Sequence, residues 1–538
     1  MVGEPDANEE TPESTERAPE TDIDAAAAWA RDHWRIVIVI AAALLLAIAC
    51  RKMQYNPDSI HYVDMARTIA EDQTVASWHL TLKAQRVPQT TLYWPPLYPM
   101  LLAGFMVLGL PYYVATWAVA VAAGTLAIYL LVFWFRHPAL TVPLVLAFIY
   151  LYFDSGVAFR AWSEVPYLPI IFGAMLCMSS AIAGASARRS LMLGVAAGAL
   201  AGAAALTRHM GLAMIPTLGL VVLLAPEAYD EETGELSDHR WHAALGAVIG
   251  LAVALIPWLV RNLVMNGQLF GISRPPSERT LSELAFWTGA MLYLDLGPIL
   301  LALIFAAAGY HLEKQPESVQ RETFTSSVMI SGLSSAAIHA VLILTVHLLF
   351  QLDEPPTKRF FFPVFASLLF AAAAVISRAE PPKLLTGRRA VILMALAAPI
   401  VLGPMFSNSV VTDVTPRSTS IDRWIIENTE ADDLVVANRG WAIRFHTGRP
   451  VLESGMIADP PISDGEKVAS FLERFGDRFG NVYVVVEAED PGLLVKWNAA
   501  GIMTERVASF ESTYHLYKRS GSRTVEIHRA WLRDNAGR

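Results

Sequence analysis

The chain has 538 residues, of which 54% are hydrophobic and 17% are charged, and its formal net charge at pH 7 is −9. Soluble domains carry roughly 25% charged residues, so the sparse charge and the apolar runs of about 20 residues predict a polytopic membrane protein rather than a soluble one. An acidic balance without a basic patch interleaved with aromatic residues does not suggest a nucleic-acid partner, and we expect none.

Residues 1–33 carry much of the negative charge and little that could be buried, so we expect a disordered, acidic, cytoplasmic tail. Such a tail is the opposite of the basic region that begins a signal peptide. The apolar run that follows, WRIVIVIAAALLLAIAC, therefore predicts a retained membrane helix. The two cysteines, Cys50 and Cys177, lack metal-ligand spacing and are expected to pack as small apolar side chains.

Apolar segments between residues 34 and 406 predict an α-helical membrane domain of about 11 spans. The run PPLYPMLLAGFMVLGL, residues 95–110, could be a full span or a helix that only dips into the membrane. The predicted spans are 36–50, 113–135, 138–153, 163–183, 190–206, 208–225, 241–263, 293–310, 325–350, 360–377 and 390–406.

The positions of Lys and Arg in short loops predict the orientation. The loops with Arg136, Arg188 and Arg321 and the loop from Arg378 to Arg389 fall on one side if residues 95–135 cross the membrane once. We then expect a multi-pass protein of the cytoplasmic (inner) membrane with its N-terminus inside. Residues 51–52 oppose this choice, because their two positive charges end up outside.

On this topology several segments share the outer side, where we expect any chemistry to occur. They are the first outer loop 51–95, the loop YFDSGVAFRAWSEVP, a loop from Arg261 to about Tyr293, the loop QLDEPPTKRFFFP, and residues 407–538. In this last part DDLVVAN and NVYVVVEAED predict buried strands, and DGEKVASFLERFGDRFG predicts a helix. The alternation predicts a small extracytoplasmic α/β domain.

The stretch YNPDSIHYVDMARTIAED, residues 55–72, follows the first span and holds the first candidate acid. Apolar residues recur at helical spacing, which predicts a half-wet helix lying along the membrane surface. Asp58 or Ser59 begins this helix, so Asp58 could simply cap the N-terminus. It could also act as a general base toward a nearby nucleophile.

Other charged residues lie where predicted spans meet the outer surface. Glu164 could pair locally with Arg160 and stabilise a helix start, or it could be a functional acid. Lys358 and Arg359 could contact lipid headgroups, or they could clamp a phosphate, because Arg offers bidentate donors and Lys a point charge. Arg208 is expected to turn toward a polar cavity, because facing lipid would be costly.

His339 and His347, eight residues apart in one predicted span, share a helix face. Without carboxylate companions they are expected to be hydrogen-bonded bundle histidines rather than metal ligands. The sequence names no cofactor with certainty, and a divalent metal ion stays an open alternative because no ligand triad of standard spacing is present.

The order of several motifs resembles the GT-C superfamily of membrane glycosyltransferases, and most closely its lipid-A aminoarabinose transferase and protein O-mannosyltransferase group. The motifs are DSIHYVDMARTIAE, YWPPLYPMLLAGF, WSEVPYLPIIFGAML, LTRHMGL, KRFFFPVFASLL and LVVANRGWAIRFHTGRPVLE. The chain departs from that group where Phe360 follows Arg359 in place of a frequent Tyr. It also departs at Trp94, where the aminoarabinose enzymes often carry a charge.

The resemblance implies an inverting transfer of a sugar from a polyprenyl-phosphate donor to a glycan, lipid or protein acceptor outside the membrane. It implies that Asp58 is the base and Glu164 a second acid. The substrate-binding or phosphate-binding set that it implies is Lys358, Arg359, Arg160, Arg208, Tyr93 and His61, with Pro95 and Pro96 closing the cavity.

Two other functions stay open at this point. A transporter or flippase of a lipid-linked sugar would typically show two related halves and a site at mid-membrane, whereas the candidate acids here cluster at one edge. A non-catalytic protein that assembles the cell envelope could keep the same scaffold.

Overall fold

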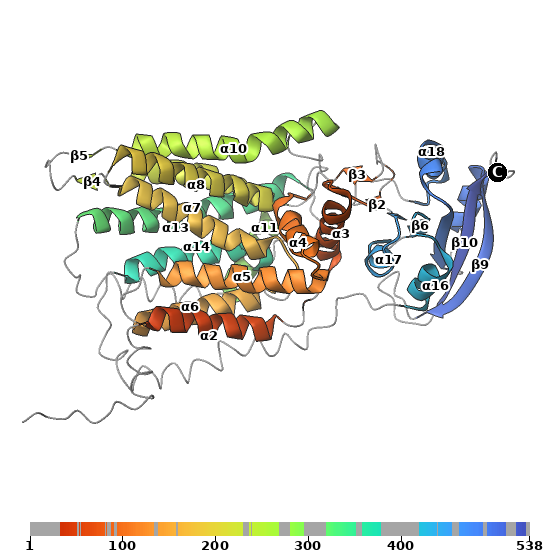
Figure 1. Cartoon of the computed structure of the whole chain (residues 1–538), viewed down its shortest axis with the longest axis horizontal. Coiled ribbons are helices and arrows are strands. Elements are labelled where there is room, and N and C mark those ends of the chain that lie inside the picture. The colour runs from red at the N-terminus through yellow and green to blue at the C-terminus, as the bar shows by residue number, and fades with distance from the viewer. Residues whose placement is uncertain are drawn as a thin grey trace, which may run out of the picture.

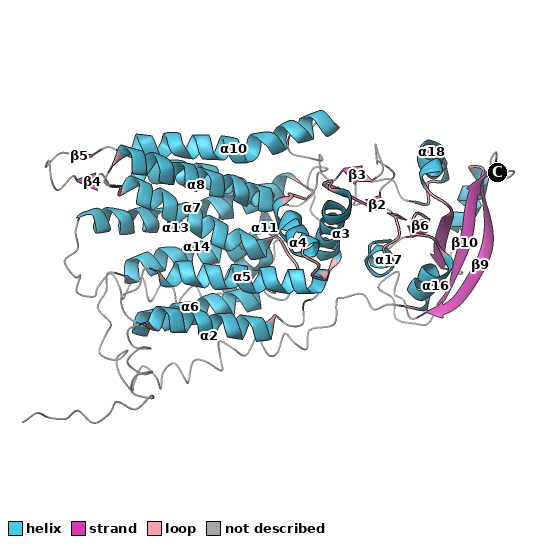
Figure 2. Ribbon diagram, in the orientation of Figure 1, coloured by secondary structure: helices cyan, strands magenta, loops and turns pink. Residues whose placement is uncertain are grey.

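The structure is a computed structural model in which two regions are joined through one helix (Figures 1 and 2). It describes residues 33–533, without residues 51–52, 54, 81, 83–87, 91–93, 134–137, 158–159, 185, 227, 230–235, 238, 268, 270–279, 295–318, 351–357, 378–418, 438–439, 454–461, 488–491 and 513–522.

The first region, here called the helical bundle, consists of helices lying side by side along the long axis of the molecule (Figure 1). Apart from α11, its helices lie close to the apolar segments predicted from the sequence. They are α2 (Trp34–Ala49), α4 (Leu97–Val107), α5 (Tyr112–Val132), α6 (Pro138–Asp154), α7 (Glu164–Ile182), α8 (Ala187–Thr207), η2 (His209–Ala213), α9 (Met214–Leu224), α10 (Arg240–Asn266), α11 (Leu281–Leu294), α13 (Val319–Leu349) and α14 (Lys358–Ile376).

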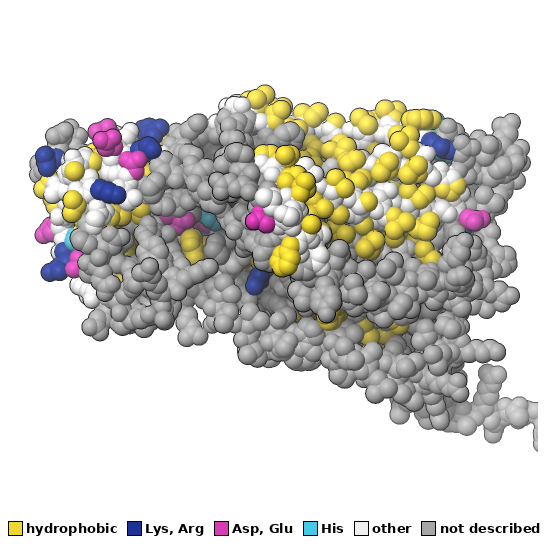
Figure 3. Space-filling view, turned by 180° about the vertical axis from the view of Figure 1, so that it is seen from behind, with side chains coloured by type: hydrophobic (Ala, Val, Ile, Leu, Met, Phe, Trp, Pro, Cys, Tyr) yellow, Lys and Arg dark blue, Asp and Glu magenta, His cyan; other side chains and the backbone are white. Residues whose placement is uncertain are grey.

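Within the described part of the chain, six helices are long and apolar enough to cross a membrane: α5, α7, α8, α10, α13 and α14. In Figure 3 hydrophobic side chains cover much of the described bundle surface. Charged side chains gather instead at the left of that view, at the end of the molecule away from the bundle. The segment 95–110, left ambiguous by the sequence, contains only the 11-residue helix α4. At 1.5 Å per residue α4 is about 16 Å long, too short to cross a bilayer core of about 30 Å.

Close packing of α8 against α10 depends on glycines. A Cβ atom at Gly198 would lie 1.9 Å from the Ala247 carbonyl oxygen, and one at Gly250 would lie 2.0 Å from that of Val195. Small residues that let helix backbones touch are the usual means of association in membranes, where lipid tails compete for apolar contacts. This packing fixes α8, which carries Arg208 at its end.

One sequence-based expectation was wrong in secondary structure. The outer loop expected from Arg261 to about Tyr293 contains the end of α10 and most of α11. Thr280 and Glu283 explain the start of α11, because the Thr280 N–H donates to Glu283 Oε2 at 2.9 Å and the Glu283 N–H donates to Thr280 Oγ1 at 3.3 Å. This capping box was present in the sequence as TLSE. The predicted spans 293–310 and 390–406 lie, wholly or almost wholly, outside the described residues.

The second region, here called the sheet region, comprises residues 419–533 and one strand from the first predicted loop. Its six-stranded sheet has the order β2-β7-β6-β8-β10-β9, in which the first four strands are parallel and the last two antiparallel. The strands are β2 (His79–Leu80), β6 (Leu434–Ala437), β7 (Val451–Leu452), β8 (Val482–Glu487), β9 (Ile502–Ser512) and β10 (Arg523–Leu532).

Both faces of this sheet are covered. Leu434 and Val436 belong to a core with Phe471, whereas Val435 belongs to the core on the other face with Ile425. Burial on both faces explains why β6 and β8 read as continuous apolar runs. The covering helices are α16 (Ser420–Asn428), α17 (Gly440–Thr447), α18 (Gly465–Phe475) and α19 (Gly492–Ala499), with a short turn η5 (Gly476–Arg478). The strands predicted in DDLVVAN and NVYVVVEAED, and the helix predicted in DGEKVASFLERFGDRFG, are confirmed. Two short antiparallel strand pairs complete the described strands. They are β1 (Ala76–Ser77) with β3 (Gln89–Thr90) and β4 (Ala228–Tyr229) with β5 (Leu236–Ser237).

Helix α3 (Pro57–Asp72) joins the two regions and lies across the end of the bundle (Figure 1). The half-wet helix expected here was wrong, because residues on several sides of α3 are buried. Ile60, Tyr62, Val63, Asp64 and Met65 are each 2% exposed or less. The sequence pattern missed this burial because the second covering surface is α17 of the sheet region, which lies far along the chain.

Candidate active site

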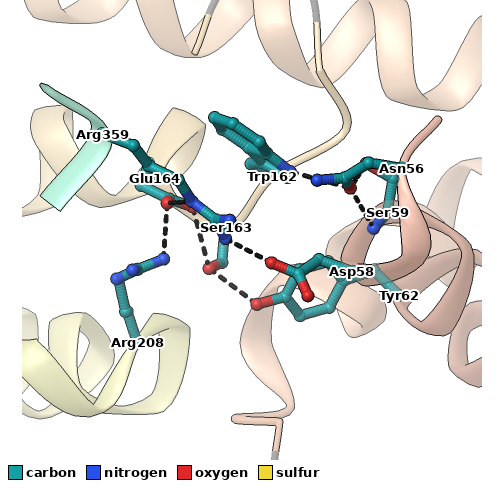
Figure 4. Close-up of polar contacts among 9 residues, drawn as sticks. All are labelled: Asn56, Asp58, Ser59, Tyr62, Trp162, Ser163, Glu164, Arg208 and Arg359. Atoms are coloured by element: carbon teal, nitrogen blue, oxygen red, sulfur yellow. Dashed lines mark hydrogen bonds and ion pairs between the residues drawn. The ribbon is translucent and has the colours of Figure 1, made fainter. Parts of the chain in front are cut away.

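Four charged side chains from four separate segments meet at the end of the bundle beside α3 (Figure 4). Asp58 comes from the first turn of α3, Glu164 from the first turn of α7, Arg208 from the end of α8, and Arg359 from the first turn of α14. All four were candidate site residues in the sequence, and the structure brings them together.

Arg359 links the two acids. Its NH2 group lies 2.6 Å from Asp58 Oδ2, and its Nε donates to Glu164 Oε1. The same Glu164 oxygen accepts from Arg208 NH1 at 2.6 Å. The site therefore holds two carboxylates and two guanidinium groups in a chain of direct ion pairs.

Burial differs along this chain of ion pairs. The Glu164 side chain is 1% exposed and that of Arg359 is 9% exposed, whereas the Asp58 side chain is 24% exposed. Charges this buried must be paired, since leaving one unpaired costs several kcal/mol. Glu164 is thus the fixed centre of the cluster, and Asp58 is the acid that solvent or a substrate can reach.

Local structure explains how Asp58 comes to point at Arg359. The possibility that Asp58 caps α3 was wrong, because Asn56 is the N-cap and its Oδ1 accepts from the Ser59 N–H at 2.9 Å. Pro57 occupies the first helical position, where its missing N–H costs nothing. Asp58 therefore does not cap the helix, and its carboxylate is available to pair with Arg359.

Arg208 is positioned by a break in the helix. Helix α8 ends at Thr207, and Arg208 takes an extended conformation before the tight turn η2. A Cβ atom at Gly211 would lie 2.2 Å from the Ala204 carbonyl carbon, so only glycine permits this reversal. Arg208 pairs with Glu164, as its expected avoidance of lipid requires, whereas the polar cavity predicted beside it stays a prediction.

Trp162 orders the site from one side. The Arg359 guanidinium carbon lies 3.9 Å from the centroid of its ring, a close cation–π contact. The Trp162 Nε1–H donates to Asn56 Oδ1 at 2.9 Å, so the tryptophan also ties the start of α3 to the segment before α7.

Arg160 places its guanidinium carbon 4.5 Å from the centroid of the Trp162 ring. The alternative in which Arg160 pairs with Glu164 was wrong, since Glu164 binds Arg208 and Arg359.

Tyr62 and Ser163 form a chain of hydrogen bonds that leads to Glu164. The Tyr62 hydroxyl donates to Ser163 Oγ at 2.8 Å, and Ser163 Oγ lies 3.4 Å from Glu164 Oε2 (Figure 4). Burial, with the charge of Glu164, raises the pKa of Tyr62 above its usual range, so it stays a protonated donor. Sequence reasoning missed Tyr62, Ser163 and Trp162 because each reads as an ordinary packing residue beside an apolar span.

The remaining candidates are distributed as follows. His61 lies on α3 one turn after Asp58, with its ring stacked on Trp94 at 5.8 Å between centroids. Pro95 and Pro96 are buried at the start of α4. Lys358 begins α14, but its side chain lies outside the described residues, as does Tyr93.

His339 and His347 are hydrogen-bonded bundle histidines, as expected. Their Nδ1 atoms lie 2.7 Å from the Ser335 carbonyl oxygen and 2.8 Å from the Ile343 carbonyl oxygen, respectively. Among the residues that the structure describes, no group of three or more His, Cys, Asp or Glu side chains could hold a metal ion.

The comparison with known structures defines the fold. ArnT from Cupriavidus metallidurans, in a crystal structure bound to undecaprenyl phosphate, matches with a TM-score of 0.53 at 15% identity, over 91% of this chain and 97% of that chain. The arabinofuranosyltransferase AftD from Mycobacteria matches with a TM-score of 0.53 at 14% identity, over 92% of this chain and 41% of that chain.

This chain shares the fold of these two proteins. At the level of sequence, no protein-family model and no curated protein matches it. The fold expected from the ordered motifs is therefore confirmed by the arrangement of the chain in space. Together with the apolar helices, the shared fold indicates a multi-pass membrane protein.

Proposed function

We propose that this protein is an inverting glycosyltransferase that moves a sugar from a polyprenyl-phosphate donor to an acceptor at the outer face of the cytoplasmic membrane. The observation that carries the proposal is the convergence of Asp58, Glu164, Arg208 and Arg359 at one end of an apolar bundle. The shared fold with ArnT, a protein crystallised with undecaprenyl phosphate, supports a lipid phosphate as the ligand class.

The proposed placement in the membrane follows from this site. A donor with an isoprenoid tail stays in the bilayer, so the reacting carbon must meet the protein at the membrane surface. We infer about 11 spans over residues 34–406, a cytoplasmic N-terminal tail over residues 1–33, and an extracytoplasmic α/β domain over residues 407–538. The first outer loop, residues 51–95, then lies beside the outer leaflet and carries Asp58.

In the proposed reaction an acceptor hydroxyl attacks the anomeric carbon of the donor sugar from the face opposite the phosphate. A new carbon–oxygen bond forms while the bond from the anomeric carbon to the phosphate oxygen breaks, and its electron pair leaves with the phosphate. Asp58, the more exposed acid, accepts the hydroxyl proton. The products are an inverted glycoside and a polyprenyl phosphate, and nearby carboxylates stabilise the positive charge that develops on the sugar.

The two guanidinium groups are suited to hold the departing phosphate, because preorganised positive charge in a buried site is worth far more than in water. Arg160, Lys358, His61 and Tyr93 belong to the proposed surroundings of the substrate.

The ion pair of Arg359 with Asp58 suggests an order of events. Asp58 Oδ2 accepts from Arg359 NH2 at 2.6 Å, so this oxygen is engaged before the donor binds. A donor phosphate that takes over Arg359 NH2 would release Asp58, the partly exposed partner, to accept a proton. Glu164 would keep Arg359 in place meanwhile through its buried contact at Nε. Donor binding would thus activate the base before the acceptor reacts.

The replacement Asp58→Asn tests this function. Mass spectrometry of the lipids retained by the gently purified protein first identifies the sugar. Sugar transfer is then measured in proteoliposomes that contain polyprenyl-phosphate sugars extracted from the host membrane. We expect a loss in turnover of at least about 100-fold, in line with general-base contributions of roughly 10²–10⁴, with lipid binding retained. Asp72→Asn, an exposed acid at the far end of the same helix, is the matched control.

The outcomes separate the candidate functions. Transfer by the wild-type protein that is lost only in Asp58→Asn supports the enzyme. Equal transfer in both variants would remove Asp58 from catalysis. Movement of the intact lipid-linked sugar across the bilayer without transfer would indicate a transporter, and neither activity would indicate an assembly role.

A further inference from the structure

Opposite faces of helix α3 contact different parts of the molecule. With 3.6 residues per turn, Asp58 and Tyr62 lie on one side of the helix, and Ile60, Val63 and Asp64 lie on roughly the opposite side. The first face meets the active-site residues through Arg359 and Ser163. The second face is covered by α17 of the sheet region.

A buried ion pair fastens this second face. Arg444 Nε donates to Asp64 Oδ1 at 2.6 Å, and the two side chains are only 7% and 3% exposed. The other oxygen of Asp64, Oδ2, accepts from the Ser77 hydroxyl and from the Trp78 N–H, the latter at 3.1 Å. One carboxylate therefore joins α3, the segment that leads into β2, and α17.

Apolar contacts surround the ion pair. Phe445, next to Arg444, packs in one buried cluster with Ile60 and Val63 of α3. Its ring also lies 5.2 Å, between centroids, from that of Tyr55, just before α3. The contact is therefore a packed surface and not a single pair of charges.

The chain leaving α3 is held by the same region. Strand β2 pairs in parallel with β7 at the edge of the six-stranded sheet. The Val451 N–H donates to the Trp78 carbonyl at 3.0 Å, and the Glu453 N–H donates to the Leu80 carbonyl at 3.1 Å. The sheet region thus grips both the second face of α3 and the segment that follows it.

We propose that Arg444 is a positioning residue for the transfer reaction: through Asp64 it fixes the rotation of α3 about its axis and so places Asp58 against Arg359. The inference rests on the proposed function. A side-chain carboxylate lies about 5 Å from the helix axis, so a rotation of 20° moves it by about 2 Å. That displacement would break the 2.6 Å contact with Arg359, and misplacements of about 1 Å can cost 10²-fold in rate.

Arg444→Ala in the full-length protein tests the proposal by two independent readouts. We expect kcat for sugar transfer to fall about 10-fold to 100-fold, with the KM for the lipid-linked donor unchanged. We also expect faster amide hydrogen exchange across residues 57–72, with no change in the peptides of α7 and α14. Arg449→Ala is the matched control, because the side-chain hydrogen bonds of Arg449 go to Thr429 and Ile426 within the sheet region.

A double variant tests whether the loss in Arg444→Ala comes from misfolding of the protein. Asp64→Asn combined with Arg444→Gln removes both buried charges and keeps side chains that can hydrogen-bond to each other. We expect it to recover most of the turnover and the slow exchange lost in Arg444→Ala.

The results would be read as follows. Wild-type kcat together with unchanged exchange in Arg444→Ala would overturn the positioning role. A parallel loss in Arg449→Ala would also overturn it, since the effect would then be general instability of the sheet region. A wild-type protein that transfers no sugar would instead refute the proposed function, and the exchange measurement would still decide whether Arg444 holds α3.

Discussion

The helical bundle and the sheet region use charge in opposite ways. In the sheet region, ion pairs such as Arg506 with Glu526 lie at the surface, where the arginine is 62% exposed. In the bundle, charges are rare, and the pairs of Glu164 with Arg208 and Arg359 are buried. Buried charge is costly to maintain, so the contrast supports the proposal that the charges at the end of the bundle form the active site.

Arg444 connects the two regions. It belongs to the sheet region, and its charge is buried against Asp64 of α3. Asp422 and Asp433 of the sheet region are buried as well, but they accept hydrogen bonds from within that region. The difference indicates that a buried charge bears on the candidate site when it pairs across the two regions.

The largest expected effect in the bundle comes from Glu164→Gln. The replacement leaves two buried guanidinium groups without their shared anion, so we expect the free energy of unfolding to fall by about 3 kcal/mol and transfer to fall by at least about 100-fold. Denaturant unfolding in detergent and a transfer assay measure the two effects. Glu473→Gln, at an exposed acid of α18, should change neither, and an equal stability for Glu164→Gln and wild type would remove Glu164 as the fixed centre.

A smaller effect is expected for Trp162→Leu, which keeps an apolar side chain but removes the ring beneath Arg359 and the N–H donor to Asn56. Desolvated cation–π contacts contribute up to about 2 kcal/mol, so we expect kcat/KM for the donor to fall by about 5-fold to 30-fold. Trp162→Phe retains a ring and should lose less. If both variants transferred sugar at the wild-type rate, the orientation of Arg359 would not depend on this stack.

The smallest effect is expected in the sheet region. Arg506→Ala removes an exposed partner of Glu526, and exposed pairs contribute about 0.2–1 kcal/mol. The free energy of unfolding should change by less than about 1 kcal/mol and transfer should stay at the wild-type rate. A loss of transfer comparable to that of Trp162→Leu would break the contrast between the two regions.

The sequence predicted the charged members of the site because charge is conspicuous in an apolar chain. Asp58, Glu164, Arg208 and Arg359 each stood at an expected membrane edge, and the structure brings all four together. Their pairing could not be predicted, since Asp58 and Arg359 lie 301 residues apart. Resemblance to a known family supplied the expected convergence, whereas spacing alone left Asp58 between a cap and a base.

The neutral members of the site and the burial of α3 could not be predicted in the same way. Tyr62 fitted an apolar helix face, and nothing in its spacing indicated a hydroxyl aimed at Ser163. The second face of α3 looked wet because its cover, Arg444, lies 380 residues beyond Asp64. Local pattern reports which residues of a helix are apolar, but only the fold determines which polar residues find a buried partner.

The proposed function requires the buried guanidinium groups at the end of the bundle to hold the phosphate of a polyprenyl phosphate. Native mass spectrometry of the detergent-solubilised protein with added undecaprenyl phosphate tests it most directly, with Arg359→Ala compared with the wild type at matched folded fractions. We predict a lipid adduct on the wild-type protein and an affinity at least about 10-fold weaker in Arg359→Ala, since a hydrogen bond to a charged group contributes about 1.5–3 kcal/mol. Equal binding by the two proteins, or no adduct on the wild type, would contradict the account.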